Sequence, residues 1–160
     1  MRYLSGQIDR ARWRNTLVYR VTPDFQAGVE YNPLADDVNP LANWRVVREG
    51  PNRPAVTLGT SSDRIGTPEG LAYYVTISKA MEAGKGRWIS PYVGLLWSEH
   101  DERFLVPAGA SIPLGGGVSF LPTYDGHAFH VMASYAWERY TLTGILVRGR
   151  DPGVALTMGF

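Results

Sequence analysis

The sequence predicts an all-β fold, a closed antiparallel up-and-down transmembrane β-barrel made by residues 1–160 as a single domain. Three observations predict it. Large apolar and small side chains alternate along most of the chain. Turn residues separate the alternating segments. The 18 Gly, 11 Pro, 9 Tyr and 5 Trp favour turns and aromatic strand positions. No segment has an extended helical periodicity, so we expect no helix.

Composition and charge exclude several classes of function. The 16 Lys and Arg against 15 Asp and Glu give a net charge of +1, so no global field favours nucleic acid. The absence of cysteine excludes disulfides and thiolate metal sites. No apolar run is long enough for a transmembrane helix. Residues 1–14 lack the apolar core of a secretory signal peptide, so an exported protein would have lost its signal. We predict no cofactor and no metal.

Strand positions follow from the alternation when strands are broken at turn residues. About twelve strands result, and ten is the alternative count. An even number suits a single-chain barrel whose two termini lie on the same side of the membrane. The expected strands are residues 2–9, 12–22, 24–32, 43–49, 53–62, 70–81, 88–98, 103–113, 117–124, 127–138, 139–149 and 152–160. The longest links, 33–42, 62–69 and 99–102, then fall on one side, which we expect to be the outer side.

The same alternation also describes a soluble sandwich or barrel whose large apolar face points inward. The second face decides between the two. It carries Gly, Ala, Ser and Thr with scattered Arg and Glu, whereas a solvent-facing surface is usually rich in Lys, Glu and Asp. We therefore expect the large apolar side chains to point outward, toward lipid. A secreted soluble barrel or sandwich with a binding surface stays open as an alternative.

The last strand carries a family resemblance. Val154, Leu156, Met158 and Phe160 share one face, opposite Gly, Ala and Thr. This segment resembles the C-terminal signal of bacterial outer-membrane β-barrel proteins, with Met158 where that family commonly has an aromatic. The resemblance implies recognition by the barrel-assembly machinery and an outer-membrane location. The partners expected are outer-membrane lipid and other envelope proteins.

Aromatic residues are placed where two membrane-interface belts would lie. We expect the outer belt to include Trp13, Trp44 and Trp97, with Tyr31 and Tyr124 beside them. We expect the inner belt to include Trp137 and Tyr140, with Tyr19 and Phe25.

Charged residues on the inward face are the main functional signal. They are Arg12, Arg14, Arg20, Glu30, Arg45 and Glu49. Pairing across the first hairpin predicts Glu30 opposite Thr16 and diagonal to Arg14, and the next hairpin brings Arg45 near, so a ladder across three strands is expected. Such a ladder either fills and braces the barrel or lines a water-filled lumen that favours anions. Twelve strands give a diameter of roughly 24 Å, wide enough for a lumen.

The predicted function is therefore a small passive pore or a structural and interaction component of the envelope. A lipid-modifying enzyme is the alternative, built from His127, His130, Ser134 and Glu138 or from Ser98, His100 and Asp101. Residues i and i+4 of a strand lie about 13 Å apart, so His130 and Ser134 cannot share a hydrogen bond. No catalytic residue is predicted on this basis.

Overall fold

The computed structural model describes residues 1–6, 9–84 and 86–160, and one antiparallel β-sheet system dominates it. The elements are β1 (Arg2–Leu4), α1 (Asp9–Arg12), β2 (Trp13–Arg20), β3 (Phe25–Asn32), β4 (Asp37–Val47), β5 (Ala55–Ser62), β6 (Leu71–Ser78), β7 (Met81–Glu82), β8 (Trp88–Ser98), β9 (Arg103–Leu105), β10 (Ala108–Gly115), β11 (Val118–Tyr124), β12 (Phe129–Trp137), β13 (Tyr140–Val147) and β14 (Asp151–Met158).

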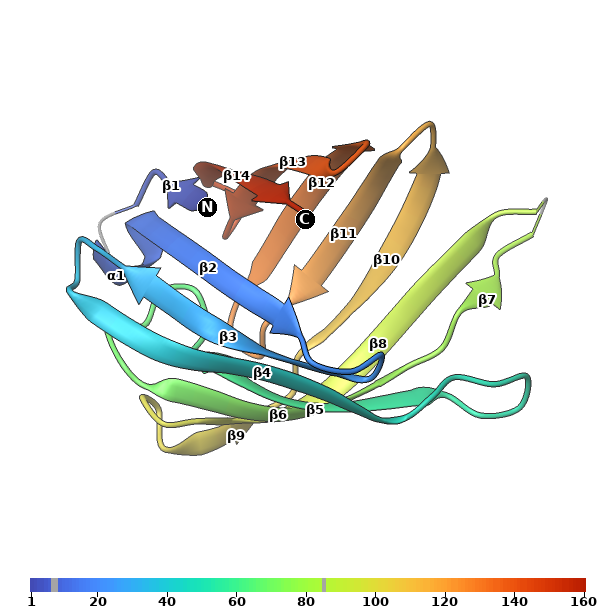
Figure 1. The fold of residues 1–160 in the computed structure, drawn as a ribbon, viewed down its shortest axis with the longest axis horizontal. Coiled ribbons are helices and arrows are strands. Elements are labelled where there is room, and N and C mark those ends of the chain that lie inside the picture. Colours follow the sequence, from blue (N-terminus) through green and yellow to red (C-terminus); the bar gives the residue numbers. More distant parts are fainter. Residues whose placement is uncertain (7–8, 85) are drawn as a thin grey trace.

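The strands form a closed barrel (Figure 1). Successive strands pair in sequence order, β1 joins β14 to β2, and β8 pairs with both β6 and β10. Of the fourteen strands among the described residues, β7 and β9 are short continuations on the two sides of β8. The ring itself therefore has twelve strands, which confirms the expected architecture.

Two expected strands differ most in their bounds. The first ends at Leu4, and the four-residue helix α1 stands at the expected join between the first two strands, where no helix was expected. The fourth begins at Asp37, because Asn32 pairs with Asp37 across a short turn. Asp36 adopts a left-handed conformation with φ of 47° in that turn. The expected long link at 33–42 was therefore wrong.

Proline also interrupts the eighth expected strand. Pro107 separates β9 from β10, yet its carbonyl accepts a hydrogen bond from the Gly94 amide at 2.8 Å, so β8 keeps a neighbour there. A register shift between Pro113 and Gly115 marks a bulge at the other end of β10. These are the irregularities expected where proline lacks a ladder donor.

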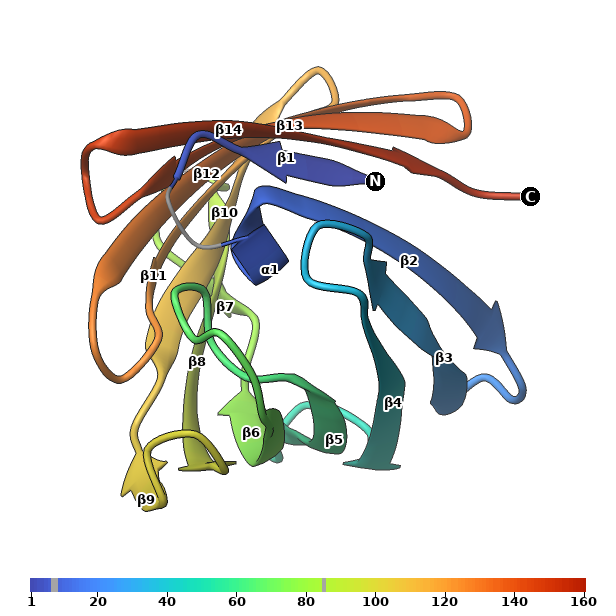
Figure 2. The same ribbon diagram turned by 90° about the vertical axis from the view of Figure 1, so that its left-hand side faces the viewer.

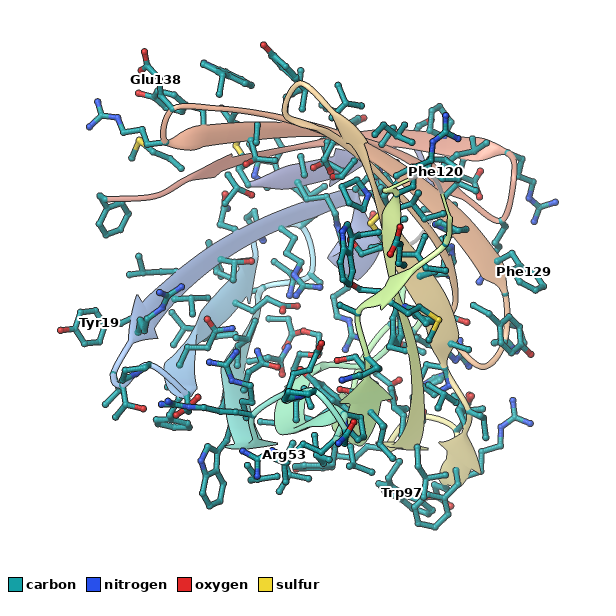
Figure 3. All side chains as sticks on the ribbon, turned by 90° about the vertical axis from the view of Figure 1, so that its right-hand side faces the viewer. Tyr19, Arg53, Trp97, Phe120, Phe129 and Glu138 are labelled. Atoms are coloured by element: carbon teal, nitrogen blue, oxygen red, sulfur yellow. The ribbon has the colours of Figure 1, made fainter. Side chains whose placement is uncertain are left out.

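The two faces of the barrel have opposite chemistry. On the outside, Leu17 is 61% exposed and Phe129 70%, whereas inward Glu30 and Ser98 are each 0% exposed. Tyr19, Trp97 and Phe129 project away from the strands (Figure 3). The prediction that the large apolar side chains point outward is confirmed. This arrangement is the reverse of a soluble protein, which turns such residues inward.

The two ends of the barrel also differ. At the end that carries residues 33–36, 63–70, 99–102, 125–128 and 148–150, here named the closed end, inward side chains such as Asn32 and His130 are buried. At the opposite end, named the open end, the inward-facing Ser111, Ala136 and Thr157 are exposed. The open end carries residues 21–24, 48–54, 79–84, 86–87, 116–117 and 138–139.

The aromatic residues lie near both ends of the strands, but the belt predicted for Trp44 was wrong. Trp13 and Trp97 lie toward the closed end, and Trp137 pairs with Tyr140 at the open end. Trp44 pairs with Phe25 and therefore lies toward the open end, not with the belt predicted for it. The cause is the early start of β4. No helix among the described residues is long and apolar enough to cross a membrane.

Closure between β8 and β10 is directly testable, because the chain has no native cysteine. Ser90 and Ser111 are paired across these strands. Opposed Cα atoms in a sheet lie about 4.5–5.5 Å apart, within reach of a disulfide. We expect the S90C/S111C variant to cross-link on mild oxidation, seen as a shift in non-reducing electrophoresis. S90C/S134C places its second cysteine on β12 and should not cross-link.

Candidate functional site

The closed end of the lumen is filled by an internal plug, defined here as α1 together with the Asp63–Gly70 loop. Figure 2 shows α1 inside the ring of strands, next to that loop. Arg10 on α1 joins the two parts and is 4% exposed. Its guanidinium donates to the Gly70 carbonyl at 2.9 Å and to Thr67 Oγ1 at 2.6 Å. Charge-assisted hydrogen bonds of this kind are stronger than neutral ones, so Arg10 holds α1 and the loop together.

The loop is also fastened to the barrel wall. Asp63 accepts hydrogen bonds from Ser98 Oγ at 2.5 Å and from the His100 amide at 3.2 Å. Arg64 forms an ion pair with Asp101. Hydrogen bonds from Arg64, and less from Arg103, lower the pKa of Asp101, so it stays ionised. The start of the plug loop is therefore held against the barrel wall.

Glu30 is the buried acid of the lumen wall. It pairs with Thr16 across the hairpin and forms an ion pair with Arg14, as predicted. The predicted contact between Glu30 and Arg45 was wrong. Glu30 faces Asn39 on β4 because that strand begins at Asp37. Arg45 lies farther along β4, where its guanidinium pairs with Asp24 at 2.9 Å.

The other predicted inward charges lie at the two ends. Arg12 is on α1 and forms an ion pair with Asp9 at 3.2 Å. Arg20 ends β2 and lines a cavity at the open end. Glu49 was expected on the inward face, but it is exposed in the turn after β4, where its carboxylate accepts from the Ala80 amide at 3.2 Å.

Sequence reasoning missed the plug residues Arg10, Asp63, Arg64 and Thr67. A signal was present, since Asp63, Arg64 and Thr67 stand together in the long link after β5. A link of this kind between strands is ordinarily a solvent-exposed loop. Arg10 fell in the short link between the first two expected strands. Only the chain path brings the two segments together within the barrel.

The residues considered for catalysis have other partners in the structure. His130 is 2% exposed and its Nε2 lies 2.8 Å from Asp125 Oδ2. Ser134 shares a 2.8 Å hydrogen bond with Thr143 instead of meeting the histidine. Ser98 is completely buried and bound to Asp63. Of the rest, His127, His100 and Glu138 are exposed. No set of three His, Cys, Asp or Glu suited to a metal ion occurs among residues 1–6, 9–84 and 86–160.

Two cavities lie at opposite ends of the barrel. The one at the closed end has a volume of about 730 Å³ and lies between α1, the plug loop and the β13–β14 turn. The one at the open end has a volume of about 440 Å³ and is lined by residues of β2 to β5. Next to it, hydrogen bonds from Arg48 and then Arg45 lower the pKa of Asp24, so that carboxylate stays ionised.

Comparison with protein-family models, curated protein sequences and solved structures gives no match.

The Arg64–Asp101 pair should make the closed end sensitive to acid. The pKa of Asp101 lies below its ordinary 3.8, so its stabilising contribution is present above that pH and is lost as the pH falls through the lowered pKa. Unfolding free energies in detergent should therefore fall less below about pH 4 for Arg64→Gln than for the wild type. Arg103→Gln removes the longer, exposed contact of 3.4 Å and should change the acid response less. Identical acid profiles for all three proteins would contradict the assignment.

Proposed function

We propose that this chain is a bacterial outer-membrane β-barrel that acts as a small passive pore, closed at rest by its internal plug. The observation that carries the proposal is the difference between the two halves of the lumen. At the closed end, the inward side chains of Ser98 and His130 are buried and hydrogen-bonded, but water reaches Arg20, Ser111 and Thr157 at the open end. A barrel that only braces a membrane has no need of a water-accessible half-lumen.

The outer surface supports a membrane location. Exposed apolar side chains such as Leu58, Ile77 and Leu95 lie on the outside of β5, β6 and β8. Such a surface is far too apolar for a protein surrounded by water, but it suits a hydrocarbon environment. Aromatic side chains near the strand ends match the interface belts of membrane barrels.

Charge supports a preference for anions. The open mouth carries Arg20, Arg45 and Arg48 against Asp24. Deeper in the barrel, Arg2 on β1 lies opposite Arg14 on β2 in the sheet, and Arg14 forms an ion pair with Glu30. Positive rings or clusters in a narrow pore lower the barrier for anions and raise it for cations.

The pore is tested by releasing the plug in planar bilayers. Arg10→Ala leaves the Gly70 carbonyl and Thr67 without their buried donor, which destabilises the plug by about 1–3 kcal/mol. We expect rare openings for the wild type and frequent, anion-selective openings for Arg10→Ala. Arg150→Ala removes an exposed arginine at the same end and should behave as the wild type.

The membrane location has a separate test. Leu95→Arg places a charge on the outside at mid-strand and should disfavour insertion by about 2–4 kcal/mol. Leu114→Arg lies at the open end of β10, near an interface, and should cost about 0–1 kcal/mol. Folding into lipid vesicles, followed by heat-modifiable electrophoretic migration, measures both. Equal folding of the two variants without detergent or lipid would favour a soluble barrel.

A structural or interaction role in the envelope is the second candidate, favoured by the many contacts that fasten the plug. Under that proposal the bilayer stays silent for folded wild type and folded Arg10→Ala alike. Silent recordings for both proteins would contradict the pore proposal, provided that heat-modifiable electrophoretic migration shows each protein to be folded.

A further inference from the structure

The open-end cavity is lined by a row of polar side chains with a defined register. Arg20 pairs directly with Gln26, and Gln26 pairs with Asn43. Directly paired residues have Cβ atoms about 4.5–5.5 Å apart on the same face of a sheet. The three side chains therefore extend into the cavity at one level, from three neighbouring strands. All three line the same volume of about 440 Å³.

The next two positions of the row orient the Asn43 amide. Asn43 pairs with Gly59, which pairs in turn with Tyr74. A Cβ at Gly59 would lie 2.4 Å from the Tyr74 ring, so only glycine leaves room for this ring. The Tyr74 hydroxyl thereby crosses β5 and donates to Asn43 Oδ1 at 2.6 Å. Because the amide oxygen is occupied, the Asn43 amino group is the part left to donate into the cavity.

Arg45 is held in place at the rim of the same cavity. Its Nε donates to Asp24 Oδ1 at 3.0 Å and a terminal nitrogen donates to the Pro23 carbonyl at 3.1 Å. Arg48 also binds Asp24, with its Nε 2.8 Å from each carboxylate oxygen. Asp24, the only acid among the described residues that line the cavity, is thus shared between two arginines.

Arg20 differs from Arg45 and Arg48. Within residues 1–6, 9–84 and 86–160 it has no ion pair or side-chain hydrogen bond, and its side chain is exposed at the cavity. A guanidinium offers a planar fork of donors that matches the two oxygens of a carboxylate or phosphate. The neighbouring Gln26, Asn43 and Thr57 are uncharged and suit hydroxyl groups.

We propose that this cavity is a binding site for a small hydroxylated oxyanion, a sugar acid or sugar phosphate. Arg20 and Arg45 hold the anionic group, and Asn43, Gln26 and Thr57 contact the hydroxyls. Tyr74 is a positioning residue, because it fixes the donor face of Asn43 without reaching the ligand. This inference names the solute that the pore admits, and it rests on the proposed function only for that role. Binding at the cavity itself does not depend on the pore.

Isothermal titration calorimetry tests binding without a bilayer. The full chain is folded in dodecyl maltoside, which has no anionic or phosphate headgroup, and titrated with D-glucuronate and separately with D-glucose. We expect glucuronate to bind more tightly than glucose. Arg20→Gln should weaken glucuronate binding by about tenfold, the usual loss for one charge-assisted hydrogen bond. Arg150→Gln, at the closed end, is the matched control and should leave binding unchanged.

The positioning role has its own variant. Tyr74→Phe keeps the ring over Gly59 and removes only the hydroxyl that holds Asn43. We expect glucuronate to bind about threefold more weakly, while inorganic phosphate, which has no sugar hydroxyls, binds as it does to the wild type. Heat-modifiable migration checks that each variant is folded. Equal affinities for glucuronate and glucose, or wild-type binding by folded Arg20→Gln, would overturn the site.

Inorganic phosphate also separates a free solute from a lipid headgroup. Displacement of glucuronate by phosphate in maltoside supports a soluble oxyanion. Blockade by a phosphocholine detergent, with no response to phosphate, assigns the site to lipid and overturns the proposal. Silent bilayers combined with weakened glucuronate binding by Arg20→Gln would contradict the pore and support the binding site. Anion-selective conductance combined with unchanged glucuronate binding by Arg20→Gln would support the pore and contradict the binding site.

Discussion

Closure of the hydrogen-bonded ring is the constraint on which the rest of the structure depends. A sheet with free edges leaves backbone donors and acceptors unpaired, and a closed ring satisfies them between strands. Here β8 completes the ring through its pairing with β10, and the short β1 links β14 to β2. Once the ring is closed, strand alternation assigns every residue to the inside or the outside. Leu17 and Glu30 differ so strongly in exposure for this reason.

Closure also creates an interior that has to be filled or hydrated. At the closed end it is filled by polar side chains, and several of them have partners. Arg10 holds Thr67, Asp63 holds Ser98, and Glu30 is paired with Arg14. Buried polar groups are stable only when paired, so this plug is specific in its geometry and costly to disrupt by a single substitution. At the open end the inward side chains, such as Ser111, Ala136 and Thr157, are small, and water reaches them.

The open end shows how the register of a sheet can assemble a site from dispersed residues. Arg20, Gln26 and Asn43 belong to three strands, and pairing alone brings them to one level. Gly59 contributes by the absence of a side chain, since it lets Tyr74 reach across a strand to Asn43. This gives the cavity donors of fixed orientation beside an arginine without an ion pair among the described residues.

Local chemistry was enough to predict much of this fold. The alternation of large and small residues determined the all-β architecture, the twelve strands and the outward direction of the apolar face, because strand side chains have a period of two. The tight hairpin at Pro23-Asp24 was enough to predict Glu30 opposite Thr16 and diagonal to Arg14. Only the tertiary structure decided the start of β4, and with it the partners of Arg45 and the level of Trp44. It alone decided that α1 and the Asp63–Gly70 loop turn inward, because their hydrogen bonds join residues far apart in sequence and leave no periodic pattern in it.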